Sequence, residues 1–225
     1  MSESKQILIL GIGNLLWADE GFGVRVVETL QQRFEFPDNV QLMDGGTQGL
    51  YLLQHVQAAD VLIVLDAIDY GLAPGTLKVV RDADVPKFLG AKKMSLHQTG
   101  FQEVLATAEL LGDYPEQILL VGVQPQELED YGGSLRDCVR QQIDPAIALV
   151  LEFLEQFNIQ LKHSSDKQEP LSALALDRYE QERPSAEVAL RVGDPRVVLS
   201  DAFEISPQPG LEDGISVDVD HRGKY

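Results

Sequence analysis

The stretch "ILILGIGNLLWADEGFGVRV" (7–26) contains the first strand, the first turn and the start of the first helix that we expect in this chain. Its apolar run (7–14) is continuous rather than alternating, which is typical of a strand covered on both faces in a parallel sheet. Later runs of the same form also end in small or acidic residues, and they are 40–46, 61–69 and 117–125. The sequence therefore predicts a buried, parallel core sheet.

Amphipathic stretches separate these strands. Apolar residues recur at helical spacing in 21–34, 49–56, 100–112 and 134–157. Because strands and helices alternate, we predict an α/β fold, a three-layer sandwich with a twisted, mostly parallel central sheet flanked by helices. Segment 76–80 is expected to add a short strand, antiparallel at an edge. Ser134 is a candidate N-cap of the last helix, which Pro145 is expected to kink or break.

The composition changes after about residue 160 of the 225. We predict an α/β domain over 1–160, and a polar linker with a loosely structured C-terminal tail over 161–225. The linker is the segment "KHSSDKQEP" (162–170), and the apolar runs that follow it are too short to form a second core.

The charge of the chain restricts its partners. With 18 Lys and Arg against 36 Asp and Glu, the formal net charge is −18, which disfavours nucleic acid because binding there depends on cations facing phosphates. The polar N-terminus and the short apolar run after it predict no membrane insertion, so the cytoplasm is the expected compartment. The only cysteine, Cys138, can make neither an internal disulfide nor a thiolate zinc cluster.

Ionisable residues follow several of the predicted strands. In open α/β sheets, ligands bind beyond the carboxyl ends of the strands, and Glu20, Asp66 and His97 come from three separate loops at those ends. Taken singly, each has a structural explanation, as a solvated charge, a helix cap or a half-buried histidine. Taken together, with Asp44 close by, two carboxylates and one imidazole predict an open divalent-metal site with positions left for water or substrate.

The glycines at the first strand end leave a nucleotide site as an alternative. Gly11 and Gly13 match the start of the dinucleotide fingerprint, but Leu16 stands at the third glycine position, and a loop precedes the helix.

The segment "DGGTQG" (44–49) lets another chain approach its backbone closely, or forms a tight turn with Thr47 as a cap. The two interpretations are compatible.

Four motifs together resemble the maturation endopeptidases of nickel–iron hydrogenase large subunits, in the branch that serves uptake hydrogenases. They are "GIGNLLWADEGFGVRV", "DGGTQG", "LDAIDYG" and "KKMSLHQTGF", which occur in the family's order within residues 5–157. The resemblance implies a metal-dependent, aspartate-type endopeptidase that removes the C-terminal extension of the nickel-loaded large-subunit precursor. Nothing is implied for the tail beyond residue 160.

The resemblance also assigns roles to residues. Glu20, Asp66 and His97 match the metal ligands, and the nickel is carried by the substrate, although another divalent metal is expected to replace it in vitro. The substrate segment falls on Asp44, Gly45, Gly46 and Thr47. Asp44 is the candidate for positioning or proton transfer, together with Glu20 and Asp66 as catalytic carboxylates. The alternatives are a non-catalytic nickel-binding assembly factor and a nucleotide-binding α/β enzyme.

Overall fold

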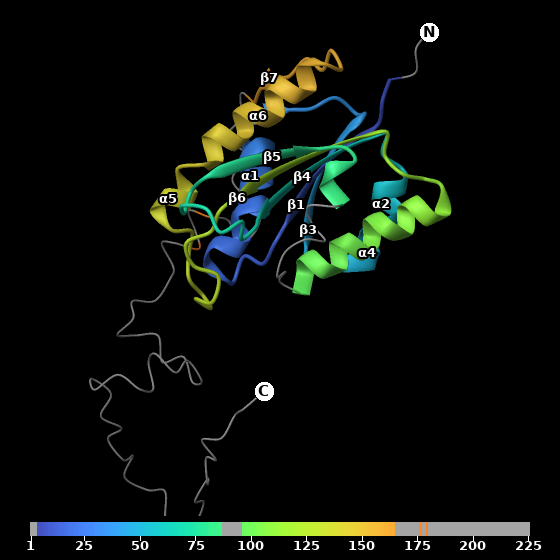
Figure 1. Cartoon of the computed structure of the whole chain (residues 1–225). Coiled ribbons are helices and arrows are strands. Elements are labelled where there is room, and N and C mark those ends of the chain that lie inside the picture. Colours follow the sequence, from blue (N-terminus) through green and yellow to red (C-terminus); the bar gives the residue numbers. More distant parts are fainter. Residues whose placement is uncertain (1–3, 87–95, 165–175, 177–178, 180–225) are drawn as a thin grey trace, which may run out of the picture. The chain divides into compact units, whose positions relative to one another are not determined.

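The computed structural model describes residues 4–86, 96–164, 176 and 179 (Figure 1). Its central sheet has five strands in the order β3-β1-β4-β6-β5. The four parallel strands are β1 (Ile7–Ile12), β3 (Val40–Gly46), β4 (Val61–Ala67) and β6 (Gln117–Val123). Strand β5 (Leu77–Arg81) pairs antiparallel with β6 at the edge, as predicted.

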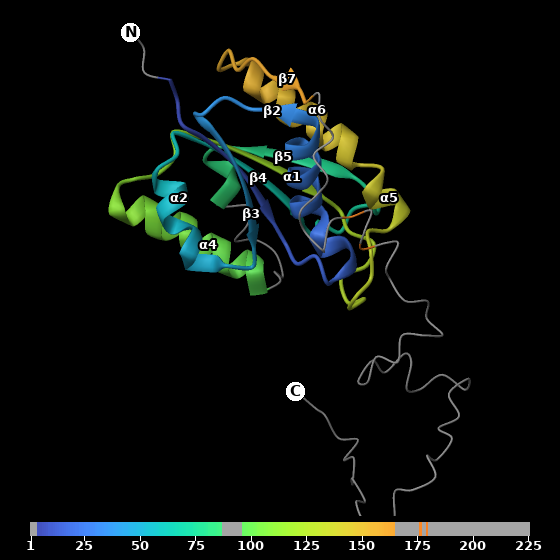
Figure 2. The ribbon, with the colours of Figure 1, turned by 180° about the vertical axis from the view of Figure 1, so that it is seen from behind.

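Helices cover both faces of this sheet (Figures 1 and 2). One face carries α1 (Phe22–Arg33) and α6 (Ile143–Glu155), and the other carries α2 (Leu53–Gln57) and α4 (Leu96–Leu111). Shorter helical turns are η1 (Ala18–Gly21), η2 (Gly49–Leu52) and α5 (Asp137–Arg140). The predicted three-layer α/β architecture is confirmed. No helix within the described ranges is long and apolar enough to cross a membrane.

Strand β1 shows why its sequence is apolar at every position. All six of its residues are buried, and alternate side chains point to opposite faces of the sheet. Ile7 and Ile9 pack in the core beneath α1 and α6, whereas Leu8 and Leu10 pack in the core beneath α2 and α4. A strand between two helical layers needs apolar side chains on both faces, so the alternation typical of a half-exposed strand is absent.

The predicted helix over 134–157 is two helices. The interruption falls at residues 141–142, between α5 and α6, so the expectation of a break at Pro145 is wrong in position. Pro145 is the third residue of α6, where a missing backbone N–H leaves no intrahelical bond unmade. Ser134 does not cap the helix either, because α5 has Arg136 at its N-cap without a side-chain bond. The Ser134 hydroxyl instead accepts a hydrogen bond from Arg140.

The described fold continues past residue 160. Strand β7 (Lys162–His163), at the start of the predicted linker, pairs antiparallel with β2 (Phe34–Glu35). Leu176 packs against the core beneath α1 and α6, and the guanidinium of Arg25 lies 5.6 Å from the centre of the Tyr179 ring. The chain divides into units 1–181 and 182–225, and the second lies outside the described residues. The loosely structured tail stays a prediction.

Two glycines allow α1 to lie directly on the sheet. A Cβ atom on Gly23 would lie 2.1 Å from the carbonyl oxygen of Leu65 in β4, and one on Gly11 would lie 2.5 Å from the carbonyl oxygen of Gly23. Both separations are far shorter than any real contact of a Cβ atom. The first turn of α1 is therefore in backbone contact with β1 and β4, at the end of the sheet where β1 turns into the helix.

We predict that Gly23→Ala lowers the free energy of unfolding by about 2–3 kcal/mol, because the backbones of α1 and β4 must separate to admit the methyl group. The matched control is Gly100→Ala in α4, where the new Cβ meets its nearest atom at 3.4 Å and alanine favours the helix. Chemical denaturation measures both variants. An equal loss in the two would contradict the proposed close packing.

Candidate functional site

Glu20 and Asp66 lie at the carboxyl end of the parallel strands. Asp66 is the last residue but one of β4, pairs with Gly122 of β6 and is 2% exposed. Glu20 lies in η1, which contacts β4, and its side chain is half-buried. The structure thus brings two of the three predicted metal ligands to one edge of the sheet. One Asp66 oxygen accepts a hydrogen bond from the amide of Ala67 at 2.8 Å.

His97, the third predicted ligand, is the second residue of α4. Its side chain lies outside the described residues, so its role as a ligand stays a prediction. Among the side chains that the structure describes, no three His, Cys, Asp or Glu groups are placed to hold a metal ion. Glu20 and Asp66 are among these side chains, and their predicted imidazole partner is not.

The glycine turn after β1 supports Glu20. Gly13 has a φ of +129°, which favours glycine, and a Cβ atom there would lie 1.7 Å from the carbonyl oxygen of Glu20. The amide of Glu20 also donates to the carbonyl oxygen of Trp17 at 2.9 Å. The backbone of Glu20 therefore rests directly on the turn, in the region where a nucleotide-binding fold would place a phosphate.

Tyr70 is a neighbour of Asp66 that sequence reasoning missed. Its hydroxyl lies over Gly122, where a Cβ atom would come within 1.8 Å of that oxygen. Burial, and after it the negative charge of Asp66, raises the pKa of Tyr70 well above its usual value of 10. The motif "LDAIDYG" contains Tyr70, but a contact with the neighbouring strand cannot be inferred from that motif.

Gln124, also missed, holds the loop after β4. It is buried at the end of β6, and its side-chain oxygen accepts hydrogen bonds from the amides of Tyr70 at 2.7 Å and Leu72 at 3.1 Å. Its side-chain nitrogen donates to Asp69 at 3.0 Å. One amide side chain thus fixes the loop that begins beside Asp66.

The predicted substrate segment ends β3. Asp44 is exposed and accepts a hydrogen bond from the amide of Gly46 at 2.9 Å, which closes a short turn. Gly45 is buried against Leu10 of β1, and Thr47 is exposed. The N-cap of η2 is Gln48, so Thr47 is not the cap of this turn.

Asp44 is separated from the two metal-ligand candidates by a strand. It pairs with Gly11 of β1, which pairs on its other side with Leu65 of β4, the residue before Asp66. Two strand spacings place the backbones of β3 and β4 roughly 10 Å apart. The backbone of Asp44 therefore lies two strands away from that of Asp66.

A buried arginine of α1 acts electrostatically on Asp44. Arg25 is 3% exposed and forms an ion pair with Glu28 at 2.8 Å. Partial desolvation raises the pKa of Asp44, against the opposing effects of the Gly46 amide and the Arg25 charge. Desolvation also raises the pKa of Glu28, which Arg25 lowers and Asp44 raises further. These three side chains form one electrostatic cluster, which the helical pattern of α1 did not indicate.

Residues 24–153 match the HycI family model, hydrogenase maturation protease. The chain belongs to the hydrogenase maturation protease family. It is 62% identical over 212 residues to the hydrogenase expression/formation protein HupM of Azotobacter chroococcum mcd 1, covering 93% of this chain and 98% of HupM. The hydrogenase 2 maturation protease of Escherichia coli K12 is 43% identical over 156 residues, covering 69% of this chain and 94% of that protein.

The fold agrees with this membership. The solved structure of the hydrogenase maturating endopeptidase HybD from E. coli superposes with a TM-score of 0.68 and 41% identity, over 72% of this chain and 99% of HybD. The family resemblance, which rests on the four motifs, and the fold, which was predicted from the alternation of strands and helices, are both confirmed. HupM matches nearly the whole of this chain, so a likeness to HupM extends into the segment that contains Leu176 and Tyr179, outside the family model.

A pocket of about 290 Å³ lies elsewhere, between α1 and α6. It is lined by Glu28, Thr29, Gln32, Arg33, Arg140, Ile143, Asp144 and Leu176. None of the predicted site residues is among them.

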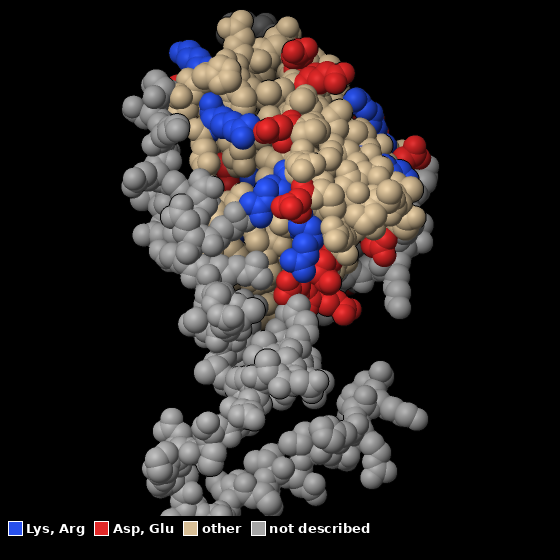
Figure 3. Space-filling model, turned by 90° about the vertical axis from the view of Figure 1, so that its left-hand side faces the viewer, with Lys and Arg blue, Asp and Glu red and all other residues tan. Residues whose placement is uncertain are grey.

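Figure 3 shows a face of the molecule on which basic side chains are interspersed with acidic ones among the described residues.

We predict that Tyr70 makes the protein sensitive to alkali. The folded-state pKa of Tyr70 lies above the unfolded value of about 10, so its stabilising effect is complete below pH 10 and is lost as the pH rises further. Above pH 10 the unfolding free energy of the wild type should fall by up to about 1.4 kcal/mol per pH unit more than that of Tyr70→Phe. Chemical denaturation of both proteins at pH 9 and pH 11 measures this difference. An equal change in unfolding free energy between the two pH values in the wild type and in Tyr70→Phe would contradict the prediction.

Proposed function

We propose that this protein removes the C-terminal extension of a nickel-loaded hydrogenase large-subunit precursor, and that Glu20, Asp66 and His97 engage the nickel carried by that substrate. The observation that supports it most is the placement of Glu20 and Asp66 at one edge of the sheet, in a member of the hydrogenase maturation protease family. The first turn of α4, which contains His97, supplies the third predicted ligand.

The chemistry of these ligands fits a metal that arrives with the substrate. Two carboxylates and one imidazole, without a thiolate, form an open site of mixed ligands that holds nickel weakly on its own. The nickel of a loaded precursor brings its own ligands and needs few more from the protease. Cleavage then depends on metal loading, and another divalent metal in the precursor is expected to substitute in vitro.

The peptide bond is hydrolysed beside this site. Water adds to the scissile carbonyl carbon, the C–N bond breaks, and the leaving amine takes up a proton. Asp44 is the candidate for positioning or proton transfer, since it is exposed on the substrate segment at the end of β3. The exposed hydroxyl of Thr47 offers a hydrogen-bonding group to an extended substrate, whereas the Gly46 amide and the Gly45 and Gly46 carbonyl oxygens already have partners within the protein.

A non-catalytic assembly factor is the second candidate, because the name of HupM states a role in hydrogenase expression and formation without naming cleavage. Such a protein would bind nickel tightly by itself and leave the precursor at full length. A nucleotide-binding enzyme is less well supported, because the backbone of Glu20 rests on Gly13 and takes the place where a nucleotide-binding fold would hold a phosphate.

We predict that Glu20→Gln, Asp66→Asn and His97→Ala each slow cleavage of nickel-loaded precursor by about 100-fold or more, because each removes one ligand of the engaged metal. The mass of the precursor before and after incubation measures the rate.

The matched controls are Asp60→Asn and His163→Ala, which should stay within about threefold of the wild type, the scatter expected for changes that leave the reacting groups in place. Asp60 precedes β4 at its opposite end, where it accepts a hydrogen bond from the Gln6 amide, and His163 is exposed on β7. Wild-type rates in Asp66→Asn and His97→Ala would reject the site. Unchanged precursor with tight nickel binding would instead favour the assembly factor.

A further inference from the structure

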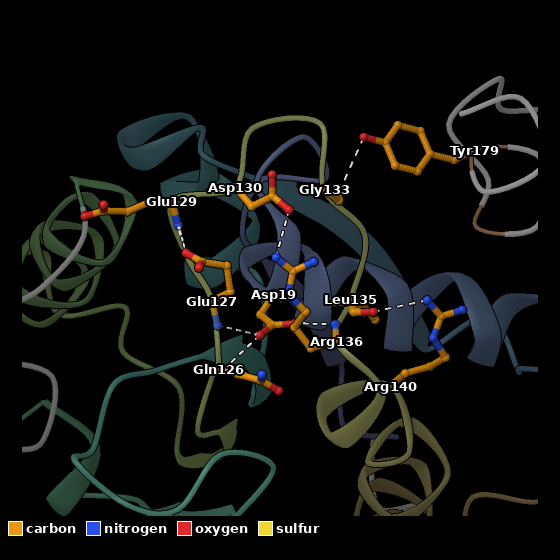
Figure 4. Close-up of polar contacts among 10 residues, drawn as sticks. All are labelled: Asp19, Gln126, Glu127, Glu129, Asp130, Gly133, Leu135, Arg136, Arg140 and Tyr179. Carbon is orange, nitrogen blue, oxygen red and sulfur yellow. Dashed lines mark hydrogen bonds and ion pairs between the residues drawn. The ribbon is translucent and has the colours of Figure 1, made fainter. Parts of the chain in front are cut away.

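Asp19, the residue before Glu20, is a fully buried carboxylate. Its Oδ2 atom accepts hydrogen bonds from the amides of Gln126 and Glu127, both at 2.8 Å (Figure 4). Its Oδ1 atom accepts one from the amide of Arg136 at 2.7 Å. Burying a carboxylate costs little only when its oxygens are satisfied, and three short amide bonds satisfy them here.

These bonds close the loop that connects β6 to α5. Gln126 and Glu127 lie at the start of this loop and Arg136 at its end, so a single side chain holds both ends together. Two backbone hydrogen bonds also join this loop to the loop after β1. The amide of Asp19 donates to the carbonyl oxygen of Glu127, and the amide of Gly132 donates to the carbonyl oxygen of Leu16.

Aromatic contacts extend the pairing of the two loops. Trp17 and Tyr131 form an antiparallel bridge, and the centres of their rings are 5.2 Å apart in an edge-to-face arrangement. The loop after β1 is thus joined along its length to the loop after β6.

The same loop contains a second buried carboxylate. Asp130 is 5% exposed and forms an ion pair with Arg136 at 2.8 Å (Figure 4). The amide of Gly133 donates to the carbonyl oxygen of Asp130 and completes a turn inside the loop. Asp130 therefore stabilises the interior of the loop, whereas Asp19 attaches the loop to the segment that carries Glu20.

The attachment bears on the two metal-ligand candidates. Glu20 rests on Gly13 and follows Asp19 directly, so its backbone is fixed by the turn on one side and by the loop after β6 on the other. Strand β6 is the hydrogen-bonded neighbour of β4, and Gly122 of β6 pairs with Asp66. Asp19 thus connects Glu20 to the loop that follows the strand bordering Asp66.

We infer that Asp19 is a positioning residue: its carboxylate holds Glu20 in place relative to Asp66 and touches neither metal nor substrate. This inference rests on the proposed function. Asparagine at position 19 keeps the shape of the side chain but replaces one acceptor oxygen with an NH₂ group, which faces amide donors. At least one backbone amide then loses its partner, and the attachment of the two loops loosens.

The test compares Asp19→Asn with Asp130→Asn, which alters a buried carboxylate in the same loop. Cleavage of nickel-loaded precursor is measured at a temperature where circular dichroism shows every variant fully folded. A displacement of about 1 Å in a catalytic group can cost about 100-fold in rate, so we expect kcat of Asp19→Asn to fall by about 30–100-fold with KM within about threefold. Asp130→Asn should keep kcat and KM within about threefold of the wild type, even if its melting temperature falls as much as that of Asp19→Asn.

A second variant preserves the Asp19 charge. Arg136 has a φ of −67°, close to the value that proline requires, so Arg136→Pro replaces the amide donor to Asp19 with the ring Cδ atom, which also displaces the Asp19 carboxylate from its place 2.7 Å from this nitrogen. It also removes the ion pair to Asp130, a loss that Asp130→Asn reproduces alone. We expect kcat of Arg136→Pro to fall by about 10-fold or more relative to Asp130→Asn, since the Asp19 carboxylate loses one of its three donors and is displaced by the proline ring.

Glu20→Gln, measured in parallel, separates the possible failures. Slow cleavage by both Glu20→Gln and Asp19→Asn supports the inference. Slow cleavage by Glu20→Gln with a wild-type kcat in Asp19→Asn overturns the positioning role and leaves the proposed function intact. Equal losses of kcat in Asp19→Asn and Asp130→Asn also overturn it. Full activity of Glu20→Gln rejects the metal site itself.

Discussion

The contact between Gly23 and the Leu65 carbonyl oxygen places the first turn of α1 directly on β1 and β4. Because the helix starts so close to the sheet, the residues between Gly13 and α1 have to leave the layer and return within a few positions. They do so as a loop and the short turn η1, which contacts β4. Glu20 is thereby carried to the edge where Asp66 ends its strand. The site depends on a backbone contact that only glycine permits.

The carboxylates around this edge fall into two kinds. Asp19 is buried with three backbone amides as donors, and its charge serves the structure. Glu20 and Asp66 lie at the carboxyl end of the parallel strands, and Asp44 lies on β3, two strands from β4 and roughly 10 Å away by strand spacing. This separation suits a division of roles, with nickel engaged on the β4 side and the substrate backbone received on the β3 side. The ligand chemistry and the fold support the same proposal from independent directions.

Local patterns in the sequence were sufficient for the sheet, its antiparallel edge strand and the three layers, because apolar runs and helical spacing report burial directly. They failed where a distant residue decides the local structure. The start of α5 depends on the amide of Arg136, which Asp19 engages from 117 positions away, so Ser134 was wrongly predicted as the cap. Tyr70 over Gly122 and Arg25 near Asp44 are likewise contacts between separate elements. The imidazole of His97 and the tail over 161–225 stay predictions, since they fall largely outside the described residues.

In the proposed function, the protease recognises nickel on its substrate through ligands at the end of the sheet. Intact-mass measurement of the large-subunit precursor, loaded with nickel or free of it, tests this claim most directly after incubation with the wild-type protein. If nickel is the recognition element, the nickel-loaded precursor loses its C-terminal extension and the nickel-free precursor keeps its full mass. Cleavage of both forms at equal rates would contradict it.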